Sequence, residues 1–192
     1  MVEFARELGQ PVQRSGGSRV GARETTSLDA YRAFTSGWLR LETLDVRELP
    51  AAIDDFRQAI AAEPKLMPPY ERLSWLALKE NKWQELADWT DQLLKLNPTN
   101  GAETYYMSSV AQFQLQNYAV AEKNAREAIR LDPANKNTRT HYVLGLALAQ
   151  KQEFTASAES LKRFLDMTPN ASDADVIRKH DKAETLVWKI IE

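Results

Sequence analysis

Four prolines recur at nearly constant spacing and divide most of the sequence into units of similar length. They are Pro64, Pro98, Pro133 and Pro169, which are separated by 34, 35 and 36 residues and end the segments AIAAEP, LLKLNP, AIRLDP and FLDMTP. Proline lacks the backbone N–H that continues a helix and disfavours helical geometry in the residue before it, so each of these positions is predicted to end a helix. A repeat of this period restricts the chain to an array of similar units.

Each of these prolines is preceded by two helical patterns of apolar residues, with a short polar turn between them. The turns contain Glu80–Asn81, Gln116–Asn117 and Lys151–Glu153. Apolar residues at steps of three and four positions indicate amphipathic helices on both sides of the turn. One unit is therefore predicted to be a pair of helices, and the fold class to be all-α.

The third unit places small and large residues in a characteristic order. It runs from Ala102 to Asn135 as AETYYMSSVAQFQLQNYAVAEKNAREAIRLDPAN. It resembles the tetratricopeptide repeat, a helix–turn–helix unit of about 34 residues, at Tyr105, Tyr118, Ala121, Ala128 and Pro133. Small residues such as Ala121 and Ala128 are needed where two helices cross at close range.

The other three units match the same pattern less completely. The fourth unit starts at Thr138, after the inserted Lys136 and Asn137, and has Leu144–Gly145, Phe154, Ser157 and Pro169. The second unit starts at about Met67 and has Tyr70, Leu73, Ser74, Trp83 and Pro98, with Leu86 and Leu93 where alanine is usual. The first unit has Ala52, Phe56, Ala59 and Pro64. An apparent insertion around Asp45–Leu49 leaves the register of the first unit open. The resemblance covers roughly residues 28–171 and implies a right-handed α-solenoid of about four repeats.

The two ends of the chain differ from this array. Residues 1–25 are rich in glycine, serine and arginine and are expected to form a flexible tail or linker. Thr26 and Asp29 predict a capping box at the start of the array, which is expected to span residues 26–171. Residues 172–192 have apolar residues at helical spacing and a polar opposite side, as expected of a helix that caps the end of a solenoid. A helix that dimerises or binds a partner is the alternative for this segment.

Composition excludes several classes of function. The 25 basic and 27 acidic residues give a net charge of −2, so there is no basic field to attract nucleic acid. With no cysteine and two histidines, the chain has no disulfide framework, and we expect no metal site and no cofactor. No apolar run is long enough for membrane insertion and the start does not resemble a signal peptide, so we expect a soluble, cytoplasmic protein.

The residues that could carry chemistry have simpler structural interpretations. His141 falls on the first helix of the fourth unit with no nucleophile at helical spacing, and His180 falls on the expected cap. The acidic pairs Asp54–Asp55 and Asp88/Asp91 fall on exposed helix faces or near helix N-termini, where acids are favourable. Gly16–Gly17 lacks the flanking strand and lysine of a phosphate-binding loop. The sequence therefore predicts no catalytic residues.

The resemblance also implies a binding surface, because the first helix of each unit lines the concave side of such an array. The residues that this places toward the groove are Glu71, Trp75, Lys79, Tyr106, Val110, Phe113, Gln114, Arg139, Tyr142, Leu146 and Gln150. Aromatic and arginine side chains commonly anchor protein partners. The alternative is that Trp75, Tyr106 and Tyr142 only contact neighbouring units.

Some proteins of this family bind a C-terminal carboxylate with lysine, asparagine and arginine side chains on the groove wall. This chain departs from that pattern. Glu71 and Trp75 stand in place of the first lysine and asparagine, and Met107 and Val143 replace later polar residues. A more apolar, extended ligand segment is therefore favoured.

These observations predict a non-catalytic scaffold for protein–protein interaction. Its ligand is expected to be a peptide or protein segment in the concave groove, with Arg139 and Lys79 as polar anchors. Two alternatives are a regulatory or assembly module within a larger multidomain protein of the bacterial signalling type, and a self-association module that forms a homo-oligomer.

Overall fold

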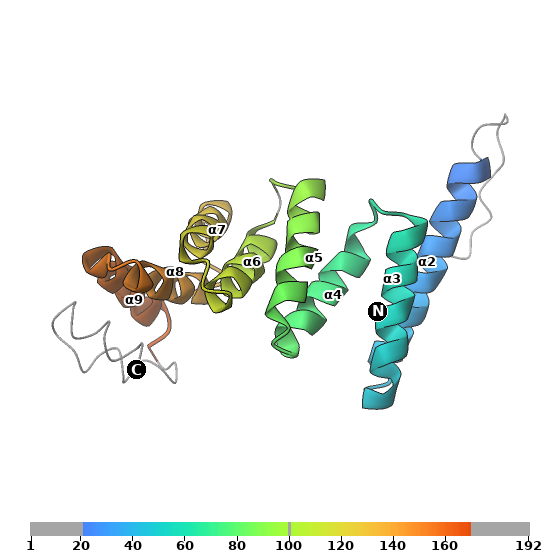
Figure 1. Ribbon diagram of the computed structural model, residues 1–192, viewed down its shortest axis with the longest axis horizontal. Coiled ribbons are helices and arrows are strands. Elements are labelled where there is room, and N and C mark those ends of the chain that lie inside the picture. Colours follow the sequence, from blue (N-terminus) through green and yellow to red (C-terminus); the bar gives the residue numbers. More distant parts are fainter. Residues whose placement is uncertain (1–20, 100, 170–192) are drawn as a thin grey trace.

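The computed structural model describes residues 21–99 and 101–169, with side chains from residue 28 onward, and the described part is entirely helical (Figure 1). It contains α2 (Gly21–Glu42), the 3₁₀ helix η1 (Val46–Glu48), α3 (Leu49–Ala62), α4 (Met67–Lys79), α5 (Trp83–Leu96), α6 (Ala102–Gln114), α7 (Tyr118–Leu131), α8 (Arg139–Gln150) and α9 (Phe154–Met167). The predicted all-α class is confirmed. His180 and the expected cap at 172–192 lie outside the described residues.

The helices form four consecutive hairpins. The pairs α2/α3, α4/α5, α6/α7 and α8/α9 pack closely, and each later hairpin packs its first helix on the second helix of the one before. The hairpins follow one another along the long axis of the molecule, from α2/α3 at one end to α8/α9 at the other (Figure 1). This confirms the predicted α-solenoid of four helix–turn–helix units.

The turn inside every hairpin contains one residue with a left-handed backbone. These residues are Leu44, Asn81, Gln116 and Gln152, with φ between 56° and 63°. A small residue precedes each of them by seven positions: Gly37, Ser74, Ser109 and Gly145. Because the two markers keep the same separation in all four units, they fix the register of the first unit, which the sequence pattern left open.

The first unit differs from the others by three residues in its turn. The second helix starts two residues after the left-handed residue in the later units, at Trp83, Tyr118 and Phe154, but five residues after Leu44 in the first. The short helix η1, which has three residues, fills this difference. The expected insertion around Asp45–Leu49 is therefore a defined helical turn.

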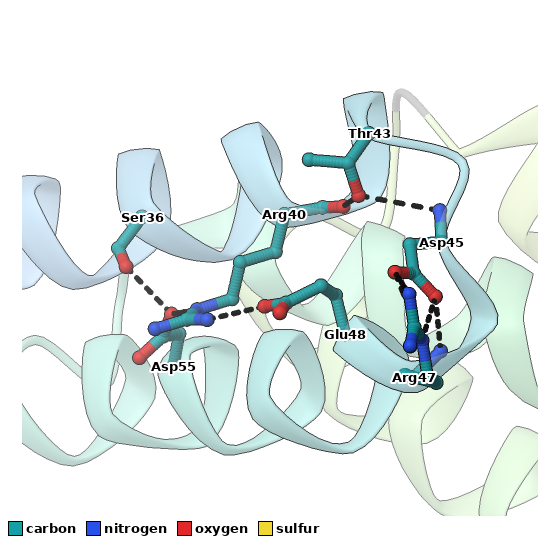
Figure 2. Close-up of polar contacts among 7 residues, drawn as sticks. All are labelled: Ser36, Arg40, Thr43, Asp45, Arg47, Glu48 and Asp55. Atoms are coloured by element: carbon teal, nitrogen blue, oxygen red, sulfur yellow. Dashed lines mark hydrogen bonds and ion pairs between the residues drawn. The ribbon is translucent and has the colours of Figure 1, made fainter.

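A polar cluster holds the inserted turn against the first hairpin (Figure 2). Nε of Arg40 on α2 donates to Oδ2 of Asp55 on α3 at 2.9 Å, and its Nη1 donates to Glu48 of η1. The Ser36 hydroxyl donates to the same Asp55 oxygen at 2.7 Å. The hydrogen bond to Glu48, and to a smaller extent the one to Asp55, raises the pKa of Arg40 above its usual value. Asp55 therefore has a structural role.

The start of the first helix is a correction to the sequence analysis. The backbone is helical from Gly21, so residues 21–25, which we assigned to the tail, belong to α2. Thr26 and Asp29, the predicted capping box, lie inside this helix and not at its start. The α2 helix is 22 residues long and extends beyond α3 at its N-terminal end (Figure 1).

The outer side of α2 is open because no described unit precedes it. Leu39 is 58% exposed, although the residues at the same place in the later units, Leu76, Ala111 and Ala147, are buried by the preceding hairpin. The same helix position is therefore core in three units and surface in the first.

Candidate functional site

The first helices of the units form the inner wall of the array. The α4 helix contacts α6, and α6 contacts α8, whereas the second helices α5, α7 and α9 have few or no contacts with one another among the described residues. Elements on the inside of a bend lie closer together than elements on its outside. The inner wall is therefore made by α4, α6 and α8, and α2 joins it where Arg72 of α4 lies over the Trp38 ring of α2, in agreement with the family resemblance.

The predicted groove residues divide into two groups by exposure. Glu71, Trp75, Lys79, Gln114 and Arg139 are exposed, and Tyr106, Val110, Phe113, Tyr142, Leu146 and Gln150 are partly buried. Trp75 is 48% exposed, which is high for a tryptophan in a packed array. The exposed group is available to a partner without rearrangement of the fold.

The partly buried aromatic residues also pack within the array. The Tyr106 ring packs on the core cluster that includes Ala77 and Met107. The Tyr142 ring lies 5.2 Å from that of Phe164 on α9, measured between ring centroids. Tyr106 and Tyr142 therefore pack within the array, as the alternative interpretation expects, and each keeps part of its surface exposed.

The sequence analysis missed the contribution of α2 to the inner wall. Trp38 follows Gly37 as Trp75 follows Ser74, so the two tryptophans occupy the same position in successive units. The signal that could have identified Trp38 is the pair of a small residue followed by tryptophan, which occurs at Gly37–Trp38 and again 37 positions later at Ser74–Trp75. Without a fixed register for the first unit, that signal was not interpreted.

Two cations stack on these two tryptophans. The guanidinium carbon of Arg72 on α4 lies 4.2 Å from the Trp38 ring centroid, and the Lys79 Nζ lies 5.2 Å from that of Trp75. The Trp38 indole N–H donates to Oε1 of Glu42 at 2.8 Å. Arg72 was also missed from sequence, because an arginine on a helix surface ordinarily faces solvent. The stacked pairs give the wall between α2 and α4 a mixed aromatic and cationic character.

A hollow of about 600 Å³ lies between the N-terminal ends of α6 and α8, the C-terminal end of α7 and the loop before α8. The inserted Asn137 lines it, where its backbone N–H donates to Asp132 at 3.0 Å and its side-chain amide donates to Glu103 at 3.1 Å. Arg139 stands at the same hollow. These hydrogen bonds explain how the chain accommodates the two inserted residues.

Nothing in the described residues indicates a catalytic or metal centre. No group of three or more histidine, cysteine or acidic side chains in ranges 21–99 and 101–169 is placed to hold a metal ion. In the first acidic pair, Asp54 lies 3.7 Å from Arg57 and Asp55 pairs with Arg40. In the second, Asp88 accepts a hydrogen bond from the side chain of Gln84 at 3.0 Å. None of the helices described here is long and apolar enough to cross a membrane.

The burial of His141 predicts that the stability of the protein depends on pH. Its side chain is 4% exposed, its Nε2 lies 3.1 Å from Oδ1 of Asn135, and Arg163 and Asp166 line the same hollow. Burial, assisted by the positive charge of Arg163, lowers the pKa of His141. The unfolded chain, with a histidine pKa of about 6.5, therefore binds a proton more readily than the folded chain.

We expect the free energy of unfolding to fall as the pH decreases below about 6.5, the pKa of histidine in the unfolded chain, toward the lower pKa of the folded chain. The fall should be smaller in His141→Tyr. Tyrosine occupies the same position in the second and third units, at Tyr70 and Tyr105, so it is the matched replacement. Urea unfolding at pH 7 and pH 5 measures the difference. Equal pH dependence in the two proteins would contradict the assignment.

Comparison with known proteins agrees with this architecture. Residues 102–135 match the sequence profile described as tetratricopeptide repeat. The chain is 25% identical over 146 residues to an E3 ubiquitin-protein ligase, CHIP, of Arabidopsis thaliana. The aligned region covers 73% of this chain and 39% of that relative, so the chain spans about two fifths of its length.

Solved structures share the fold. The chain superposes on the MamA protein with a TM-score of 0.71 and 17% identity, covering 84% of this chain and 81% of MamA. YrrB, described as a TPR protein with an unusual peptide-binding site, gives a TM-score of 0.67 at 17% identity and covers 92% of both chains. The Arabidopsis OM64 TPR domain gives 0.55 at 22% identity, covering 64% of this chain and 94% of the domain. Residues 102–135 therefore match the tetratricopeptide repeat, and the four hairpins have the fold of these tetratricopeptide-repeat structures.

Proposed function

We propose that this chain is a non-catalytic scaffold that binds an extended segment of a partner protein along the inner wall formed by α2, α4, α6 and α8. The observation that carries the proposal is the row of aromatic side chains on these helices, in which Trp75 is 48% exposed. Tryptophan and tyrosine side chains are enriched at protein interfaces and among the residues that contribute most to binding.

The remainder of the wall supports the same function. Gln114 and Arg139 are exposed beside the partly buried Tyr106 and Tyr142, so polar groups flank apolar contact area. Aromatic anchors surrounded by polar groups are typical of protein interfaces. One face of an array this size offers at most a standard interface, consistent with a Kd of about 1 μM, or about −8 kcal/mol.

The proposal is tested with a peptide selected from a displayed random library on the wild-type protein. Its Kd is then measured against Trp75→Ala, Tyr106→Ala and Tyr142→Ala. We expect about a tenfold or greater loss of affinity for Trp75→Ala, because truncating an interface anchor costs about 2 kcal/mol or more. Smaller losses are expected for the two tyrosines, which share their contact area with the core.

Val120→Ala is the matched control, since Val120 is an exposed apolar residue on the outer helix α7. It should bind as the wild type does. Circular dichroism melting establishes that each variant is folded. Unchanged affinity in all three folded aromatic variants would show that the inner wall is not the binding site.

A further inference from the structure

Arg72 is the one residue in the described part of the chain with a buried side-chain polar atom that lacks a hydrogen-bond partner. Its Nε is buried and unbonded. Its guanidinium stacks on Trp38, and no carboxylate of the described residues lies within ion-pair distance of it. Removing a charged donor from water without supplying an acceptor is unfavourable, and stacking on an indole offsets only part of that cost. The terminal Nη nitrogens of Arg72 are not buried and have no hydrogen bond or ion pair among the described residues, so a ligand can supply their acceptor.

The acidic residues near Arg72 form no ion pair with it in the described structure. Glu42 accepts the Trp38 indole N–H, and Glu71, which is exposed on the same helix, forms no ion pair with Arg72 or Lys79 in the described structure. By contrast, Arg40, Arg47, Arg126 and Arg130 all have carboxylate partners. Glu42 and Glu71 balance the charges of Arg72 and Lys79, so this part of the wall has no net positive charge. An anion is therefore attracted by direct contact with Arg72 and not by a long-range field.

We propose that Arg72 binds a carboxylate side chain within an extended, partly apolar segment of a partner protein, and that Trp75 covers an apolar side chain of that segment. This inference rests on the proposed function of the inner wall. The planar guanidinium presents paired N–H donors that match the two oxygens of a carboxylate. The exposed Lys79, whose Nζ lies over the Trp75 ring, adds a second positive charge on α4.

The helix geometry specifies the spacing of the ligand residues. Arg72 and Trp75 are three positions apart on α4, so they are neighbours on one helix face, about 5–6 Å apart at Cβ. In an extended peptide, residues two positions apart point to the same side and are separated by about 7 Å. The segment is therefore expected to carry an aspartate or glutamate two positions from a large apolar residue.

The experiment selects binders from a displayed library of random peptides of about twelve residues, fused at both ends so that no free carboxyl terminus is present. Wild type, Arg72→Gln, Trp75→Ala and Lys95→Gln are screened in parallel. Lys95→Gln is the matched control, because it makes the same charge change at an exposed site on the outer helix of the same unit. Melting curves confirm folding, and Arg72→Lys retains the charge without the planar group.

We expect wild type and Lys95→Gln to enrich an acid two positions from an apolar residue. Arg72→Gln should lose the acid and keep the apolar preference, and Arg72→Lys should be intermediate. A selected peptide should lose about tenfold in affinity when its acid is changed to the amide, and that change should have little effect on binding to Arg72→Gln. Such a double-mutant cycle isolates the coupling between the two groups.

The outcomes separate this inference from the proposed function. Peptides that need Trp75 but show no acid preference, or whose acid preference persists in Arg72→Gln, overturn the role of Arg72 and leave the inner wall as the binding site. Binding only by peptides with a free carboxyl terminus, measured with synthetic peptides, also overturns it. If no peptide is enriched, or if binding is independent of the inner-wall aromatics, both proposals fail.

Discussion

Phe56→Ala is expected to destabilise the first hairpin by about 3–5 kcal/mol, the usual cost of removing a fully buried aromatic side chain. Phe56 is completely buried between α2 and α3. Its ring lies 5.8 Å from that of Phe34, and it belongs to the cluster that includes Leu73 and Leu76 of the next unit.

The loss should appear as early, local unfolding. In a repeat array each unit contacts only its neighbours, so a terminal unit can open while the remainder stays folded. Hydrogen exchange measured by mass spectrometry should show lost protection in α2 and α3, with little change in α8 and α9. Val46→Ala, an exposed apolar change in the same unit, is the control and should alter stability by less than about 0.5 kcal/mol. Equal loss of protection across all four units would contradict this view.

Gly145→Leu is expected to have the second large effect, a loss of about 1–3 kcal/mol by overpacking. A Cβ atom at Gly145 would lie 2.6 Å from Cγ of Leu161 and 3.3 Å from the carbonyl oxygen of Ser157. Leu161 is fully buried, and the Ser157 hydroxyl donates to the Gly145 carbonyl at 2.8 Å, so α8 and α9 cannot separate without losing contacts.

Graded variants make this prediction specific. Gly145→Ala should cost less than Gly145→Leu, since alanine favours the helix by about 1 kcal/mol relative to glycine and offsets part of the clash. Gly101→Ala is the matched control, because a Cβ there would meet its nearest neighbour at 3.4 Å, an ordinary contact. Thermal unfolding should rank Gly101→Ala as the most stable of the three. A Gly145→Leu protein that melts with the wild type would disprove the close crossing.

Much of the fold could be predicted from local features of the sequence. The repeating prolines and polar turns mark where helices end, and these signals act over a few residues. They therefore located the second helix of every unit, and each of the four prolines lies just beyond a helix end. The start of α2 could not be predicted in the same way, since Gly21 is a weak helix former and Thr26–Asp29 resembles a cap.

The candidate site was less accessible to sequence reasoning. Glu71, Trp75 and Lys79 are found exposed on α4, but no sequence pattern indicates that Trp38 and Arg72 form a stacked pair between two units. These residues are 34 positions apart, and the register that relates them became clear only from the shared left-handed residue and the small residue seven positions before it.

The sequence alone determined the period of the array, the helical class and the small residues at close crossings, because each depends on backbone chemistry or on side-chain size at one position. The tertiary structure decided which residues are covered. Leu39 is exposed and Leu76 is buried at the same place in their units, since exposure depends on whether another hairpin packs there. The same reason applies to Arg72, whose surroundings are supplied by a helix from the preceding unit.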